Sequence, residues 1–331
     1  MYKVGLIGCG FMGSMHADCY AALADRVKIV AVADLVAENA EKFSQKFDAK
    51  IYADAEDLIK NADVDYVDIC LPTYLHCQYA KMAMQQGLNV FVEKPLCLTN
   101  EQAKELLAVQ KETGKIVQVG QVIRFWDEYV WLKDAKESGK FGDLKFITMH
   151  RYSARPTWAW NNWLHNIELS GGMAFDMHEH DADYLRYLLG EPKSIKSTNV
   201  KEEGALTDYI STLYEYDGAM ANIDCCWNFP TEFPFTMYFC ARFEKATVVY
   251  NSASGEFAVY YADGGKEDIQ IEKGLDTTSS SGGNISSLGG YFNELKYFVD
   301  RLDNPSLPDI ASLEEGAKSV ALVLSEIHTD I

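Results

Sequence analysis

The sequence lacks any apolar run near the ~20 residues that a membrane-spanning helix needs. It also passes from Met1 directly into the apolar run 4–8, without the charged and apolar regions of a signal peptide. Basic residues are scarce, since 30 Lys and Arg stand against 49 Asp and Glu, giving a net charge of −19. Nucleic acids and anionic membranes bind to clustered Lys and Arg, so we expect neither as a partner. A cytoplasmic enzyme or binding protein remains.

The eight cysteines lack the spacings of metal or redox sites. There is no C-x-x-C pair, and most of the thiols lie in apolar runs such as 68–71, where cysteine behaves as a small hydrophobic residue. Free, buried thiols in a reducing compartment are the simplest interpretation.

The length of 331 residues favours two domains at ~150 residues each, and the pattern changes near residue 121. Before that point, short apolar runs predict strands at 3–8, 28–34, 65–71, 89–93 and 116–120. Helical spacing predicts helices at 14–25, 36–47, 76–86 and 100–113, two of them followed by the plausible C-caps Gly87 and Gly114. Alternating strands and helices predict a parallel α/β sheet covered on both faces, over residues 1–121.

Residues 122–331 have a different pattern. Helices are predicted at 127–138 and 172–189, and strands at 143–150, 207–216, 219–228, 234–241, 245–250 and 256–262. Turn signals such as Asp217-Gly218 separate the later strands, which is typical of an antiparallel meander of hairpins. A Ser-, Thr- and Gly-rich loop at 274–290, either a substrate lid or a surface loop, precedes helices at 291–302 and 312–328. We therefore expect an α+β domain with an open, mainly antiparallel sheet.

A glycine motif, Gly8-Cys9-Gly10-Phe11-Met12-Gly13, follows the first predicted strand and opens a helix. The first glycine permits a tight turn, the second lets the backbone approach a pyrophosphate, and the third brings the helix close to the strand. The N–H groups at the helix N-terminus let an acidic protein bind an anionic dinucleotide without a basic patch.

Asp34 ends the second predicted strand, 21 residues after Gly13 and near the ~20 expected of a ribose-binding carboxylate. The alternative is that Asp34 only caps the following helix. Because Leu35 and not an arginine follows it, a ribose 2′-phosphate would be repelled, and NAD is favoured over NADP.

Two further segments hold residues suited to catalysis. Lys94, in Glu93-Lys94-Pro95, follows a strand end that lines the ligand crevice of a parallel sheet, where a cation could stabilise a developing alkoxide. The alternative is a surface lysine. Helical spacing also places four polar residues of the 172–189 helix on one face: Asp176, His180, Asp183 and Tyr187. We expect His180 to act as general base or acid and Asp176 to orient its ring, with a solvated helix face as the alternative.

His178-Glu179-His180 also suggests a metal site. However, two histidines separated by one residue on a helix point about 200° apart. The H-x-x-x-H spacing that brings two ligands together is absent from the sequence, so we predict no metal ion.

The glycine motif, Glu93-Lys94-Pro95 and the glycine-led Asp176-x-x-x-His180 together resemble the Gfo/Idh/MocA family of glucose–fructose oxidoreductase, inositol dehydrogenase and rhizopine-catabolism proteins. The resemblance covers essentially the whole chain. It implies an NAD-binding Rossmann domain (1–121) with a doubly wound parallel sheet, and a substrate-binding α+β domain (122–331) whose open sheet forms homodimer or homotetramer contacts. It also implies oxidation or reduction of a sugar or polyol.

The resemblance assigns roles to individual residues. Lys94, Asp176 and His180 fall on the family's catalytic positions, and Asp34 falls on the acid that selects NAD. Pro72 and His76 match the family's Thr-Pro-Asn-x-x-His loop, whereas Leu71 and Thr73 replace its Thr and Asn. The expected cofactor contacts are Gly8, Gly10, Phe11, Met12, Gly13, Asp34, Leu71, Pro72, Thr73, His76, Glu93 and Lys94.

Substrate contacts are expected from residues around the catalytic three. The family usually has Gly at position 178, so His178 either adds a polar group to the pocket or points into the domain interface. Arg124 lies just past the domain junction and is a further candidate. Trp163, with Trp158 and Trp160, either stacks on sugar faces or belongs to an interface or core.

These residues predict an NAD-dependent dehydrogenase of a sugar or cyclic polyol. The alternatives are a glycoside-cleaving enzyme that oxidises its substrate transiently before elimination, and a non-catalytic dinucleotide-binding regulator. Residues 122–331 contain 18 basic and 33 acidic residues, and this charge favours a neutral substrate over an anionic one. Three arginines could reverse that field locally: Arg124, Arg151 and Arg155.

Overall fold

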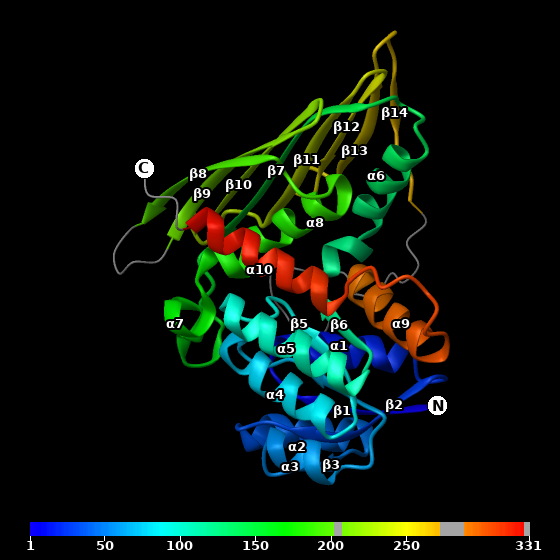
Figure 1. The fold of residues 1–331 in the computed structure, drawn as a ribbon, viewed down its shortest axis with the longest axis vertical. Coiled ribbons are helices and arrows are strands. Elements are labelled where there is room, and N and C mark those ends of the chain that lie inside the picture. The colour runs from blue at the N-terminus through cyan, green and yellow to red at the C-terminus, as the bar shows by residue number, and fades with distance from the viewer. Residues whose placement is uncertain (202–206, 272–287, 328–331) are drawn as a thin grey trace. The chain divides into compact units, whose positions relative to one another are not determined.

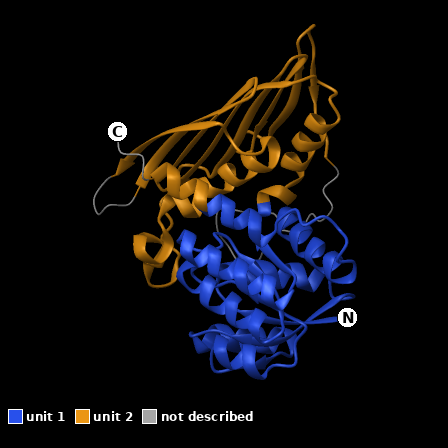
Figure 2. Cartoon of the chain, in the orientation of Figure 1, with its two compact units in different colours: residues 1–122, 275–320 blue, residues 123–274, 321–331 orange. Residues whose placement is uncertain are grey.

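The structure, a computed structural model, describes residues 1–201, 207–271 and 288–327 (Figure 1). The chain forms two compact units (Figure 2). Unit 1 comprises residues 1–122 and 275–320, and unit 2 comprises 123–274 and 321–331. The sequence analysis assigned everything after residue 121 to a second domain, whereas 275–320 cluster with the first unit.

Unit 1 is built on a six-stranded parallel sheet in the order β3-β2-β1-β4-β5-β6. The strands are β1 (Tyr2–Ile7), β2 (Val27–Ala33), β3 (Lys50–Ile51), β4 (Tyr66–Ile69), β5 (Asn89–Glu93) and β6 (Val117–Gly120). Every residue of β4 and β6 is buried, so both faces of the sheet are covered. The five predicted strands are confirmed, and only the two-residue edge strand β3, which has no apolar run, was missed.

The helices of unit 1 begin and end where local sequence allows. They are α1 (Phe11–Ala22), α2 (Ala37–Phe47), α3 (Ala55–Asn61), α4 (Thr73–Gln85), α5 (Asn100–Thr113) and α9 (Gly289–Asp303). The Thr99 hydroxyl caps α5 by accepting from the Gln102 N–H, and Gly114 ends it in the left-handed conformation, as predicted. Helix α4 packs beside α3 and α5, and α1 packs beside α9.

Unit 2 is built on an eight-stranded sheet in the order β14-β13-β12-β11-β7-β10-β9-β8. The strands are β7 (Leu144–Ala154), β8 (Ser194–Lys201), β9 (Thr207–Tyr216), β10 (Ala219–Phe229), β11 (Thr236–Phe243), β12 (Ala246–Asn251), β13 (Glu256–Tyr261) and β14 (Lys266–Asp268). Only the pair β7–β10 is parallel, so the predicted fold class is confirmed.

The predicted run of hairpins in unit 2 is wrong at one point. Strand β7 inserts between β10 and β11, so these two strands do not pair with each other. Strand alternation in the sequence shows where strands lie but not which strand lies beside which. The strands β8 and β14 were not predicted.

Helices α6 (Asp127–Glu137) and α8 (Glu179–Leu189) of unit 2 lie along one face of its sheet (Figure 1). The other helical segments are η1 (Val122–Phe125), which begins at the last residue of unit 1, η2 (Trp160–His165), α7 (Ile167–Ser170) and the π-helical turn η3 (Ala174–His178). Helix α10 (Leu313–Ile327) begins in unit 1 and ends in unit 2. The proposed lid at 274–290 falls mostly outside the described residues. Among the described helices, none is both long and apolar enough to cross a membrane.

Candidate cofactor and catalytic sites

The glycine loop joins the end of β1 to the start of α1, and its three glycines meet three different constraints. Gly8 has φ +92°, and a Cβ there would lie 2.5 Å from the Cys70 carbonyl oxygen. A Cβ on Gly13 would lie 2.0 Å from the Gly8 carbonyl oxygen, so helix and strand approach too closely for a side chain. A Cβ on Gly10 would meet nothing within 4 Å. This open space at the N-terminus of α1 is where a pyrophosphate needs close access to the backbone.

Asp34 follows β2 and is held against the glycine loop. One carboxylate oxygen accepts from the Cys9 N–H at 2.7 Å, and the other accepts from the Val36 N–H at 2.7 Å. The side chain is partly exposed. Helix α2 has Val36 as its N-cap and no side-chain cap. The position beside the loop is the one that a ribose-binding carboxylate requires.

Lys94 follows β5 and is partly exposed, with a cis peptide bond to Pro95. Its backbone N–H donates to the Glu93 carboxylate at 3.0 Å. The predicted cofactor residue His76 is buried and lies beneath this loop, because its two ring nitrogens are 2.7 Å from the Pro95 oxygen and 2.6 Å from the Leu71 oxygen. It therefore ties the loop after β4 to the loop after β5, and any effect on a cofactor passes through these loops.

A buried polar cluster that includes Glu93, the residue before Lys94, was not anticipated from the sequence. His16 of α1 is fully buried, with Nδ1 2.9 Å from the Asp68 carboxylate and Nε2 3.0 Å from the Glu93 carboxylate. Tyr20 also donates to Asp68 at 2.9 Å. Glu294 of α9 is fully buried, and its carboxylate oxygens have no hydrogen-bond partner among the described residues. The signals were a histidine and an aspartate inside otherwise apolar segments, 11–22 and 66–69.

The charges in this cluster favour protons over a metal ion, although His16, Glu93 and Glu294 bring ligand atoms within 4.8 Å of one another. Both ring nitrogens of His16 face carboxylates. This arrangement suits an imidazolium, which donates from both nitrogens, whereas a metal ion would need an unprotonated Nε2. Burial disfavours that cation, but the charges of Asp68 and Cys70 and the hydrogen bonds to both residues together outweigh burial and raise the pKa of His16 well above its ordinary value. Burial and the charge of Glu93 raise the pKa of Glu294 well above its ordinary value. Both effects favour the protonated, neutral form of Glu294.

In unit 2, the predicted helix at 172–189 consists of the π-helical turn η3 followed by α8. Asp176 lies in the π-helical turn and His180 in the first turn of α8, and both are partly exposed. Phe175, Ala182 and Leu185 of this segment are buried. Inserted π-helical residues occur frequently at functional sites, where they redirect a side chain.

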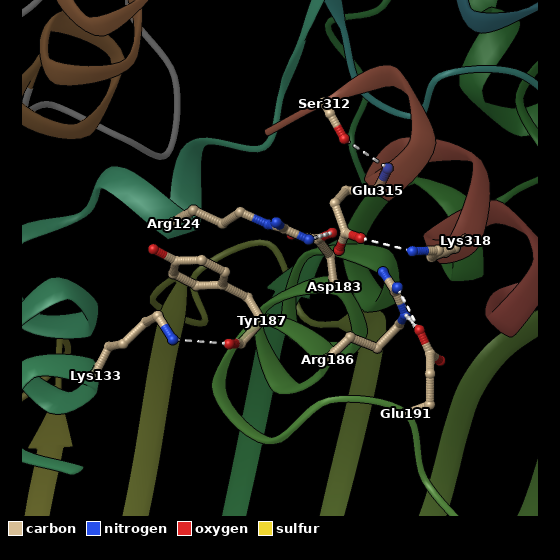
Figure 3. Close-up of polar contacts among 9 residues, drawn as sticks. All are labelled: Arg124, Lys133, Asp183, Arg186, Tyr187, Glu191, Ser312, Glu315 and Lys318. Carbon is tan, nitrogen blue, oxygen red and sulfur yellow. Dashed lines mark hydrogen bonds and ion pairs between the residues drawn. The ribbon is translucent and has the colours of Figure 1, made fainter. Parts of the chain in front are cut away.

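Asp183, on the predicted polar face, belongs to a buried ion pair, so this part of the face is not open to solvent. Asp183 and Arg124 are both about 1% exposed in their side chains. Nε and Nη2 of Arg124 donate to the two Asp183 oxygens at 2.8 and 2.7 Å (Figure 3). The Arg124 guanidinium also lies 4.8 Å from the ring centre of Tyr187. This guanidinium thus has a carboxylate and an aromatic ring as partners within unit 2.

Two other arginines of unit 2 have aspartate partners. Arg151 donates to Asp181 through Nε at 3.2 Å and Nη2 at 2.8 Å, and both residues are buried. Arg155 forms an ion pair with Asp208, which also accepts from the Trp227 indole at 3.0 Å. All three arginines that could have attracted an anionic substrate therefore have a carboxylate beside them.

His178 points away from His180 and into the interior. It is fully buried, and its Nε2 lies 2.6 Å from the Glu326 carboxylate of α10. The structure thus gives His178 a partner inside unit 2, in place of either location considered from the sequence. Trp158 and Trp160 are 53% and 48% exposed, so neither is a core residue, and Trp163 is partly exposed.

Comparison with known proteins identifies related sequences and folds. A model described as an oxidoreductase family with an NAD-binding Rossmann fold matches residues 2–121, and the GFO/IDH/MocA C-terminal domain matches residues 129–249. The uncharacterized oxidoreductase YrbE of Bacillus subtilis (strain 168) is 28% identical over 66% of this chain and 65% of its own length. Inositol 2-dehydrogenase of Rhizobium meliloti (strain 1021) is 31% identical over 59% of this chain and 58% of its own length. The chain thus aligns with less than two thirds of these relatives' lengths.

Solved structures share the fold of the entire chain. A levoglucosan dehydrogenase in complex with NADH and levoglucosan superposes with a TM-score of 0.86 at 22% identity, covering 99% of this chain and 96% of the other. The same two-part architecture therefore occurs in a protein that holds a nicotinamide cofactor and an anhydrosugar.

Proposed function

Because the chain belongs to the Gfo/Idh/MocA oxidoreductase family, we propose that it is an NAD-dependent dehydrogenase of neutral sugars or cyclic polyols. The observation that carries this proposal is the glycine loop, with Gly10 facing open space and Asp34 held beside it. Those residues fit a dinucleotide, because backbone N–H groups meet the pyrophosphate and a carboxylate meets the ribose. The expected cofactor residues 8, 10–13, 34, 71–73, 76, 93 and 94 remain part of the proposal.

The chemistry is a hydride transfer between a secondary alcohol carbon and the cofactor. NAD⁺, when bound, supplies the hydride acceptor. His180 removes the hydroxyl proton as the C–H bond breaks, and the carbon becomes a ketone. The ammonium of Lys94 stabilises negative charge that develops on the oxygen, and Asp176 orients the His180 ring. Trp163 remains a proposed contact for the sugar face, whereas Arg124 and His178 act through their protein partners.

A neutral substrate is favoured by the charges of unit 2. Each of Arg124, Arg151 and Arg155 has an aspartate partner, so no net positive charge arises from these three pairs. The surrounding acidic excess repels anions. Inositols and levoglucosan, which similar proteins are named for or bind, are the first compounds to try.

We further propose that two copies of the chain associate through the outer face of the eight-stranded sheet, as a homodimer or within a homotetramer. Apolar side chains gather there on three adjacent strands, where Phe146, Leu213 and Met220 are 38%, 45% and 46% exposed. Met220 of β10 pairs in register with Phe146 of β7. Leu213 of β9 pairs with Asn222, the next outward residue along β10. Such a patch on a sheet face is typical of protein interfaces. Light scattering with Leu213→Glu and Met220→Glu tests this, since retained oligomers would contradict it.

The proposed location is the cytoplasm. All eight cysteines fall in described parts of the chain and are free thiols, five of them buried. Free thiols suit a reducing compartment. Localisation of the tagged chain in fractionated cells would test this directly.

The test of function is NADH formation across inositols, anhydrosugars, aldoses and glycosides. Turnover is expected in the wild type, with severe loss in His180→Ala and Lys94→Ala. Lys104→Ala removes an exposed lysine of α5 in the same unit and should leave turnover unchanged. Glycoside cleavage without net NADH would select the elimination reaction instead, and cofactor binding without any turnover would select a regulator.

A further inference from the structure

The π-helical turn η3 (Ala174–His178) lies between the proposed catalytic residues and the core of unit 2. Met173 and Met177 pack into a buried apolar cluster with Ile210 of β9 and Trp227 of β10. Asp176, between them, is partly exposed, and so is His180 two residues beyond the turn. The turn therefore has an anchored side and a side that presents Asp176.

A second, polar anchor holds the same turn. The Nε2 of His178 lies 2.6 Å from one Glu326 oxygen, and the Tyr214 hydroxyl donates to the other oxygen at 2.5 Å. All three side chains are fully buried. Asn199 of β8 donates to the Glu326 backbone oxygen at 3.1 Å, which fixes the end of α10 against the sheet. Three elements distant in sequence thus meet at one carboxylate.

Protonation states in this anchor are well defined by its contacts. Burial and the neighbouring Glu326 charge raise the pKa of Tyr214 well above its ordinary value, so its hydroxyl stays protonated and donates. The Nδ1 of His178 has no partner among the described residues. A neutral ring with its proton on Nε2 leaves only an acceptor unpaired, whereas an imidazolium would leave a buried donor unpaired. His178 therefore serves as a single N–H donor to Glu326.

We propose that His178, Glu326 and Tyr214 are positioning residues that fix the π-helical turn, and through it the orientation of Asp176 and His180. This inference rests on the proposed dehydrogenase function. His178 and His180 point to opposite sides of the helix, so a ring locked inward at 178 sets the rotation of the helix start that bears His180. The buried hydrogen bonds to Glu326 hold the π-helical turn more firmly than apolar packing alone. Breaking them would leave the buried carboxylate charge without these donors, which costs free energy.

The size of the expected effect follows from the geometry of proton transfer. A misplacement of 1 Å in a catalytic group can lower turnover ~100-fold. We therefore expect His178→Ala to lower kcat ~10- to 100-fold, with the KM for NAD⁺ unchanged because the cofactor loop belongs to unit 1. His178→Gln keeps an N–H donor toward Glu326 and should restore most of the activity.

The experiment compares kcat, KM and the pH dependence of kcat/KM in wild type, His178→Ala, His178→Gln and Tyr214→Phe, with folded fraction checked by circular dichroism. Tyr209→Phe is the matched control, because Tyr209 lies on the same strand but faces outward and is only partly buried. The proposal predicts a lower kcat in His178→Ala and Tyr214→Phe, together with a shift in the part of the pH profile of kcat/KM that reports the titration of His180. His178→Gln and Tyr209→Phe should have near-normal kcat and pH profiles. Wild-type kcat and pH profile in folded Tyr214→Phe would overturn it, even if His178→Ala fails to fold.

Two further measurements separate this proposal from the proposed function. Hydrogen exchange of residues 174–180 and NMR titration of His180 need no substrate. If the wild type turns over nothing, the function fails, yet faster exchange and a shifted His180 titration in Tyr214→Phe still support the anchor. Unchanged exchange and titration in that variant would overturn the anchor whether or not the enzyme is active.

Discussion

Replacing Gly10 by alanine should separate cofactor binding from folding. The added Cβ would meet nothing within 4 Å, and the φ of −82° lies outside the left-handed region. Because Gly10 is the N-cap of α1, alanine costs about 1 kcal/mol or less in stability. The methyl occupies the space that we assign to the pyrophosphate. Overpacking of about 1–3 kcal/mol there weakens NAD⁺ binding by roughly 5- to 150-fold.

Gly13→Ala is the contrasting variant. Its Cβ would lie 2.0 Å from the Gly8 oxygen, whereas ordinary contacts begin at 3.4 Å. Relief requires the start of α1 to move about 1.4 Å from the end of β1, since both groups are backbone. We therefore expect Gly13→Ala to lower both the melting temperature and the affinity for NAD⁺.

Calorimetric titration with NAD⁺ and thermal unfolding provide the assay. Gly114→Ala is the control, because its φ of +64° strains alanine, yet it ends α5 away from the glycine loop. It should lose stability and keep its affinity, the reverse of Gly10→Ala. Wild-type NAD⁺ affinity in Gly10→Ala would refute the assignment of the open space to the cofactor.

Three other substitutions test individual interactions. Asp34→Ala should weaken NAD⁺ binding more than NADP⁺ binding, measured as the ratio of the two KM values, and an unchanged ratio would contradict its ribose role. Asp183→Asn removes the buried carboxylate charge that pairs with Arg124 and should cost ~3–5 kcal/mol in denaturant unfolding, whereas Asp217→Asn, in an exposed pair, should cost almost nothing. Glu294 has a raised pKa in the folded chain, so it destabilises the fold as pH rises above its ordinary value of 4.5. Glu294→Gln should therefore gain stability relative to wild type between pH 5 and 8, by at most ~1.4 kcal/mol per pH unit, and a pH-independent difference would argue against a neutral Glu294.

The local patterns of the sequence predicted much of unit 1. Apolar strands, helical spacing and the glycine motif depend on neighbouring residues, and the structure places each glycine where its expected constraint applies. The insertion of β7 between β10 and β11 was missed because strand pairing depends on distant segments. Likewise, the family boundary at residue 121 gave no sign that 275–320 return to unit 1.

The geometry around the candidate site departs from the sequence prediction at particular residues. A 3.6-residue period cannot reveal the π-helical turn that carries Asp176. Nor can it show that Arg124, 59 residues away in sequence, encloses Asp183 in a buried ion pair. The same limit applies to His178, whose partner Glu326 is 148 residues away in sequence. The local sequence, Asp176-Met177-His178-Glu179-His180-Asp181, is mostly polar and gave no signal of a buried partner.

Hydride transfer from a carbohydrate carbon to NAD⁺ is the central claim, and isotope transfer tests it most directly. The best neutral substrate of the panel, deuterated at the carbon that is oxidised, is incubated with wild-type enzyme and NAD⁺, and the NADH is analysed by mass spectrometry. The account predicts NADH that carries the deuterium, formed in equal amount to the ketone, and its loss in His180→Ala. NADH without deuterium, or no NADH from any neutral sugar or polyol, would contradict the account.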